Sequence, residues 1–211
     1  MYLTLVDFIE ELHANSVVSV QRKKTLQPLI DMITLNQYDV AGINLNFICT
    51  HNSRRSILAQ VWAQLAAHYY GIANVTCYSG GTEQTSIAST ILSTLSDQGL
   101  CIDALTDGTN PVYAIKYAEN ALPIIGFSKK YDHAFNPVSS FIAVLTCSQA
   151  DVGCPYVVGA KSRIPITYED PKIADSTENE AAVYADCSVQ IASEMFYVFS
   201  QIKKIDLCPY E

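Results

Sequence analysis

The chain has 211 residues, a length that suits one main domain with its own core. With 49% apolar and 16% charged residues, its composition is that of a globular protein and not of a disordered chain. The net charge of -8 provides no basic face, and the chain has no run of about 18 uncharged apolar residues, so we expect no nucleic-acid partner, no membrane segment and a cytoplasmic location.

Residues 1–40 differ from the rest of the chain because their apolar side chains repeat at helical spacing. Two sets each fall on one helical face: Leu3, Val6, Ile9 and Leu12, and then Leu26, Leu29, Ile30 and Ile33. Asn15 and Ser16 separate the two sets. We predict an N-terminal helical extension over 1–40, packed on the main domain or on a second copy of the chain.

From residue 41 onward, strand and helix patterns alternate, and we assign 41–211 to the main domain. The predicted strands are 43–49, 74–80, 122–128, 140–147 and 163–168. The predicted helices are 55–70, 86–98 and about 178–203. This order favours an α/β fold with a parallel sheet that is covered on both faces. Ligands of such sheets bind beyond the carboxyl ends of the strands, where Cys49 lies.

The segment CTHNSRRS, residues 49–56, joins the first strand to the next helix. Backbone N–H groups at a helix N-terminus bind anions, and Arg55 could add two parallel hydrogen bonds to a tetrahedral oxyanion. The same positive field favours the thiolate of Cys49 as a nucleophile, with Ser56 as its hydrogen-bond donor. Asn52 tolerates a left-handed backbone and would hold the loop shape. The predicted oxyanion-binding residues are Thr50, His51, Asn52, Ser53, Arg54 and Arg55.

This Cys-x5-Arg-Ser loop between a strand and a helix resembles that of the low-molecular-weight protein tyrosine phosphatase superfamily. The resemblance covers roughly residues 43–204 and implies a four-stranded parallel sheet with helices on both faces. It also implies a general acid in a downstream Asp-Pro pair, which is Asp170-Pro171 in the stretch YEDPK. Glu169 is the neighbouring alternative. The extension over residues 1–40 has no counterpart in small members of the family.

The stretch LTCSQADVGCP, residues 145–155, is similar to a signature of thioredoxin-coupled arsenate reductases. This resemblance implies that Cys147 and Cys154 relay oxidation away from Cys49 and that thioredoxin regenerates the enzyme. It implies no cofactor. We also expect no metal site, because the histidines are widely spaced and Gln60 stands where some reductases have a potassium-binding acid.

Two alternatives to an arsenate reductase stay open. The same loop could hydrolyse phosphotyrosine or small phosphomonoesters through a phosphocysteine at Cys49. Alternatively, the protein could be a regulator that senses redox state through its thiols. The seven cysteines are an odd number and we find no export signal, so we expect the thiols to be reduced.

Overall fold

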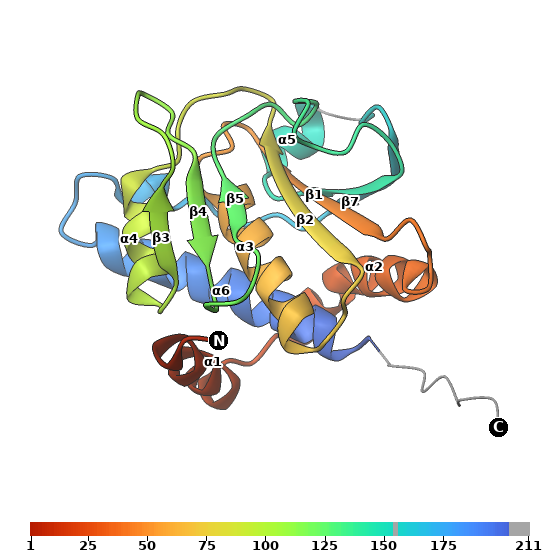
Figure 1. Cartoon of the computed structure of the whole chain (residues 1–211), viewed down its shortest axis with the longest axis horizontal. Helices are drawn as coiled ribbons and strands as arrows, with labels where there is room; N and C mark the ends of the chain where they lie inside the picture. Colours follow the sequence, from red (N-terminus) through yellow and green to blue (C-terminus); the bar gives the residue numbers. More distant parts are fainter. Residues whose placement is uncertain (154–155, 203–211) are drawn as a thin grey trace.

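The computed structural model describes residues 1–153 and 156–202 (Figure 1). The predicted N-terminal helices are present as α1 (Leu3–Asn15) and α2 (Val20–Asn36), and Ser19 caps α2 by accepting a hydrogen bond from the Arg22 N–H. Both helices contact the long C-terminal helix α6 (Glu180–Ser200). In α1 the buried residues are Leu5, Ile9 and Leu12, whereas Leu3 of the predicted face is 82% exposed. The predicted apolar set of α2 is buried in the core of the main domain, so the extension packs on its own chain.

The central sheet has four parallel strands, as the resemblance implied, and their order is β2-β1-β6-β7. Its strands are β1 (Ile43–Cys49), β2 (Val75–Gly81), β6 (Phe141–Leu145) and β7 (Ala160–Pro165). Helix α3 (Arg55–Tyr69) packs on β1 and β2 and against α6, whereas the short helix α5 (Ser148–Gly153) contacts β1 and β6. The remaining helices are α4 (Ser89–Asp97) and a 3-10 helix, η1 (Pro171–Ala174).

The sheet buries both faces because side chains alternate along each strand. Phe47 and Val144 point into the large core shared with α3 and α6. Their neighbours Ile48 and Leu145 point into a smaller core on the other side, which also contains Cys49. Among the described residues, none of the helices is both long and apolar enough to cross a membrane.

The prediction for 122–128 was wrong about the sheet. Residues 124–126 form β5 (Ile124–Gly126), which belongs to a separate antiparallel sheet with β3 (Cys101–Ala104) and β4 (Tyr113–Lys116). A short apolar run does not reveal whether its partner strands are parallel or antiparallel. The side chains of β3 are mostly exposed, so its sequence lacks the alternation of apolar and polar residues that would predict a strand.

The junction between the extension and the main domain can be tested at Gly99, which follows α4 with φ +96°. A Cβ there would lie 2.5 Å from the backbone N of Leu5 in α1, whereas a Cβ at Gly108 (φ +111°) would meet nothing within 4 Å. We expect Gly99→Ala to lower the free energy of unfolding by about 2–4 kcal/mol and Gly108→Ala by about 1 kcal/mol. Urea unfolding of both variants measures the difference, and equal losses would contradict the packing of α1 on this turn.

Candidate active site

Strand β1 lies between β2 and β6 and carries Cys49 to the carboxyl edge of the sheet, where the chain turns into α3. Cys49 is 3% exposed, and its Sγ accepts a hydrogen bond from the Asn52 N–H at 3.2 Å. Ser56 Oγ lies 3.1 Å from the same sulfur. The thiol is therefore held at the base of the loop, in contact with a backbone N–H and a hydroxyl.

The loop backbone is fixed from outside. The carbonyl oxygens of Thr50, His51 and Ser53 accept hydrogen bonds from residues beyond the loop, which are Glu83, Ser128 and Ala88, respectively. Because the N–H and C=O of a peptide point in opposite directions, carbonyls that face outward turn the following N–H groups inward. The loop thus has the form of an anion-binding cradle at the N-terminus of α3.

Asn52 connects this cradle to the segment after β5. It adopts a left-handed backbone with φ +48°, as its residue type allows. Its Oδ1 accepts from the Lys129 N–H at 3.0 Å, and its Nδ2 donates to Ser56 Oγ at 2.9 Å. Asn52 therefore fixes both the loop and the hydroxyl that contacts Cys49.

Arg55 is the first residue of α3, and its side chain is 9% exposed. Its Nη1 donates to the Tyr168 carbonyl at 3.1 Å, and its Nη2 donates to Asp170 Oδ2 at 2.5 Å. Its Nε is buried and has no hydrogen-bond partner among the described residues. An unpaired buried N–H is costly, so this atom marks a place where an oxygen of a bound anion would be stabilised.

Asp170 lies after β7, at the start of η1, where its Oδ1 accepts from the Lys172 N–H at 3.1 Å. Its side chain is 33% exposed. A cleft of about 230 Å³ opens beside it. The residues that line the cleft come from α3, α5 and the segment before η1: Arg55, Ser148, Gln149, Thr167, Tyr168, Glu169 and Asp170. Both candidate acids therefore line the same cleft as Arg55.

Cys147 lies directly before α5 and is 1% exposed. Its Sγ accepts a hydrogen bond from the Ala150 N–H at 3.3 Å and lies 3.5 Å from Thr50 Oγ1. It shares the smaller core with Cys49. The structure thus brings two of the three predicted relay cysteines to the same edge of the sheet, and Cys154 lies outside the described residues.

The side chains of Arg54 and His51 have their partners outside the anion-binding cradle. Arg54 donates to Asp175 at 2.8 Å and to the hydroxyl of Tyr184 at 2.5 Å. Burial raises the pKa of Tyr184 to about 12. The His51 imidazole lies 3.5 Å from the Glu83 carboxylate on the surface. Any contact of these two residues with an oxyanion at the loop would therefore come from their backbone N–H groups.

The sequence analysis missed Lys129, which is fully buried beside the loop. Its Nζ donates to the Phe127 carbonyl at 3.3 Å and lies 4.3 Å from the centre of the Phe127 ring. Burial lowers the pKa of Lys129 to about 7. A lysine gives no signal of burial in a sequence, so only the fold could reveal this group.

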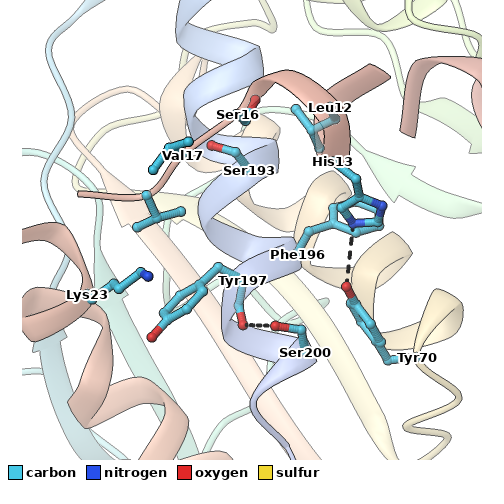
Figure 2. Close-up of a pocket in the computed structure, with 11 residues that line it drawn as sticks. Leu12, His13, Ser16, Val17, Lys23, Tyr70, Ser193, Phe196, Tyr197 and Ser200 are labelled. Atoms are coloured by element: carbon cyan, nitrogen blue, oxygen red, sulfur yellow. Dashed lines mark hydrogen bonds between the residues drawn. The ribbon is translucent and has the colours of Figure 1, made fainter. Parts of the chain in front are cut away.

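A separate cavity of about 250 Å³ lies at the far end of α3 (Figure 2). It is lined by α1, α2, α6 and Tyr70, whose hydroxyl lies 3.4 Å from His13 Nε2. The described residues around it include no cysteine and no carboxylate. Since α3 is about 22 Å long, this cavity is remote from Cys49.

Comparisons with known proteins bear on the family resemblance and the fold. Residues 44–124 match the family described as low molecular weight phosphotyrosine protein phosphatase. The predicted resemblance to this phosphatase superfamily is confirmed. No curated protein sequence matches the chain.

Among the described residues, no group of three or more His, Cys, Asp or Glu side chains could hold a metal ion.

Solved structures that are similar to this chain include an arsenate reductase and a phosphatase. An arsenate reductase from Archaeoglobus fulgidus DSM 4304 is 16% identical with a TM-score of 0.51, and the alignment covers 74% of this chain and 98% of that one. A low-molecular-weight phosphotyrosine phosphatase from Vibrio cholerae O395 is 14% identical with a TM-score of 0.51, covering 75% and 95%. At these identities the likeness shows the fold alone.

The buried Lys129 makes the free energy of unfolding depend on pH. Between pH 7 and about 10, the Lys129 amine is protonated in the unfolded chain and neutral in the folded chain. Because the unfolded chain binds more protons, the free energy of unfolding rises with pH in that window. We expect Lys129→Met to remove a rise on the order of 3 kcal/mol. Urea unfolding across this range measures it, with Lys130→Met at the exposed neighbour as control. Parallel pH curves for wild type and Lys129→Met would contradict the assignment.

Proposed function

We propose that the protein is an arsenate reductase that uses Cys49, Cys147 and Cys154, with thioredoxin as its reductant. The observation that carries this proposal is the position of Cys147, which is buried against Thr50 beside the nucleophile. The cradle of residues 50–55 and the unpaired Arg55 Nε support binding of a tetrahedral oxyanion.

The proposed reaction uses two electrons from two thiols. Cys49 attacks arsenate and expels a hydroxide, which leaves as water after protonation, to give a thiol–arsenate adduct. Cys147 then attacks the Cys49 sulfur, so that arsenite leaves with the electron pair of the S–As bond and a Cys49–Cys147 disulfide forms. Cys154 attacks Cys147 and releases Cys49, and thioredoxin reduces the resulting disulfide.

Helix α5 would have to unwind during the last exchange. In a continuous helix, the Cα atoms of residues 147 and 154 would lie about 10 Å apart, beyond the roughly 7 Å that a disulfide spans. The packing of α5 supports this step because Ala150 is its only buried residue and Val152 is 80% exposed. A short, poorly packed helix costs little to open.

The cleft beside Arg55 supports a small inorganic substrate. Glu169, Asp170 and Gln149 contribute polar groups, whereas the one aromatic residue of its lining, Tyr168, is buried. A phosphotyrosine ring would therefore find little apolar surface in this cleft.

A coupled assay separates the relay from the oxyanion chemistry. With arsenate, thioredoxin, thioredoxin reductase and NADPH, we expect Cys147→Ser and Cys154→Ser each to lower NADPH oxidation by at least about 10²-fold, because each removes a thiol that the electron transfer requires. Cys101→Ser is the matched control, since Cys101 is exposed on β3, in the sheet that does not carry Cys49. Arsenate-dependent turnover that survives in Cys147→Ser would overturn the relay.

The second candidate is a phosphatase, and the observation that favours it is the ion pair between Arg55 and Asp170. This pair holds a carboxyl group next to the side chain that would bind the phosphoryl group. In this reaction Cys49 would form a phosphocysteine. The bound phosphoryl group would replace Asp170 as the partner of Arg55, and Asp170, released from the ion pair and protonated, would donate its proton to the departing oxygen. Water would then hydrolyse the intermediate.

We expect Asp170→Asn to lower kcat/KM for phenyl phosphate by about 10²-fold, because a poor leaving group needs the proton. The control is Glu169→Gln, which changes the neighbouring carboxylate of the same cleft. Steady-state hydrolysis measures both variants. A large loss in Glu169→Gln with little change in Asp170→Asn would instead assign the acid to Glu169.

A further inference from the structure

Arg22 of α2 forms an ion pair with the buried Glu194 of α6. Its Nε and Nη2 donate to the two carboxylate oxygens at 2.7 and 2.6 Å, and the Glu194 side chain is 3% exposed. Such two-bond pairing fixes the plane of the guanidinium. Hydrogen bonding to Glu194 raises the pKa of Arg22, so the group stays charged.

The remaining nitrogen of Arg22 reaches the segment that carries the candidate acid. Its Nη1 donates to the Thr167 carbonyl at 3.2 Å, and its Cζ lies 5.0 Å from the centre of the Tyr168 ring. Thr167 and Tyr168 directly precede Glu169 and Asp170. The extension therefore contacts the chain three residues before Asp170.

Tyr168 is also held by Arg55 of the loop at residues 49–56 and by the segment after β6. Arg55 donates to the Tyr168 carbonyl at 3.1 Å, and the Tyr168 N–H donates to the Thr146 carbonyl at 3.1 Å. Residues 167–168 thus lie between two guanidinium groups, one from the extension and one from the loop. A shift of this segment would move the Asp170 carboxyl relative to Arg55.

We propose that Arg22 is a positioning residue for Asp170, so that the N-terminal extension completes the active site. This inference rests on the role of Asp170 as general acid in the second candidate function, the phosphatase. Anchoring the extension alone would not require the Thr167 contact, because α2 already buries Leu26, Leu29 and Ile33 completely in the core. A buried ion pair is also weak evidence for stability by itself.

Aryl phosphates of different leaving groups test this role. With Arg22→Met, we expect kcat/KM for phenyl phosphate to fall about 10-fold and that for 2,4-dinitrophenyl phosphate to change less than about twofold, since only the poor leaving group needs a well-placed acid. The control is Lys23→Met, whose side chain lies over the Tyr197 ring at 5.1 Å instead.

Arg22→Met leaves Glu194 buried without its partner, which could prevent folding. The double variant Arg22→Met/Glu194→Met removes both charges together and is expected to fold and to show the same dependence on the leaving group. Amide hydrogen exchange gives a readout besides activity, and we expect the Tyr168 and Lys172 N–H groups to exchange at least about 10-fold faster in the double variant.

Equal losses for both aryl phosphates, or no loss, would overturn the positioning role, as would unchanged exchange at Tyr168 and Lys172. If the wild type hydrolyses neither ester, the phosphatase role of Asp170 fails, whether or not the protein reduces arsenate. In that case the exchange rates alone decide whether Arg22 orders the segment.

Discussion

The geometry of the site depends on the Arg55 guanidinium, which joins the loop after β1 to the segment after β7. Two of its nitrogens bind Tyr168 and Asp170, and the third is buried without a partner among the described residues. The loop carbonyls are bonded outward, and the Asn52 N–H donates to the Cys49 sulfur. One arginine thus joins the loop that carries Cys49 to the segment that carries Asp170.

The surrounding structure tolerates local costs to keep this arrangement. Asn52 has a left-handed backbone, Arg55 has an unpaired buried N–H, and Lys129 is buried with a lowered pKa. Each feature is unfavourable by itself, and such features gather at functional sites. The parallel sheet and the large core shared with α1 and α2 supply the stability that offsets them.

The sequence revealed those parts of the fold and site that depend on local patterns. The apolar strand 43–49, the loop residues and the helix that begins at Arg55 are contiguous, so their relation could be predicted. The antiparallel sheet could not, because β3 is short and mostly exposed. Lys129 and Arg22 were missed because their contacts join residues 77 and 172 positions apart, which no local pattern encodes.

The oxyanion site is tested most directly by a crystal structure of the protein with orthovanadate, which mimics a tetrahedral anion under attack. The account predicts vanadium bonded to Cys49 Sγ, with a vanadate oxygen about 3 Å from Arg55 Nε. Vanadate bound elsewhere, or an unoccupied loop with Arg55 Nε still unpaired at saturating vanadate, would contradict it.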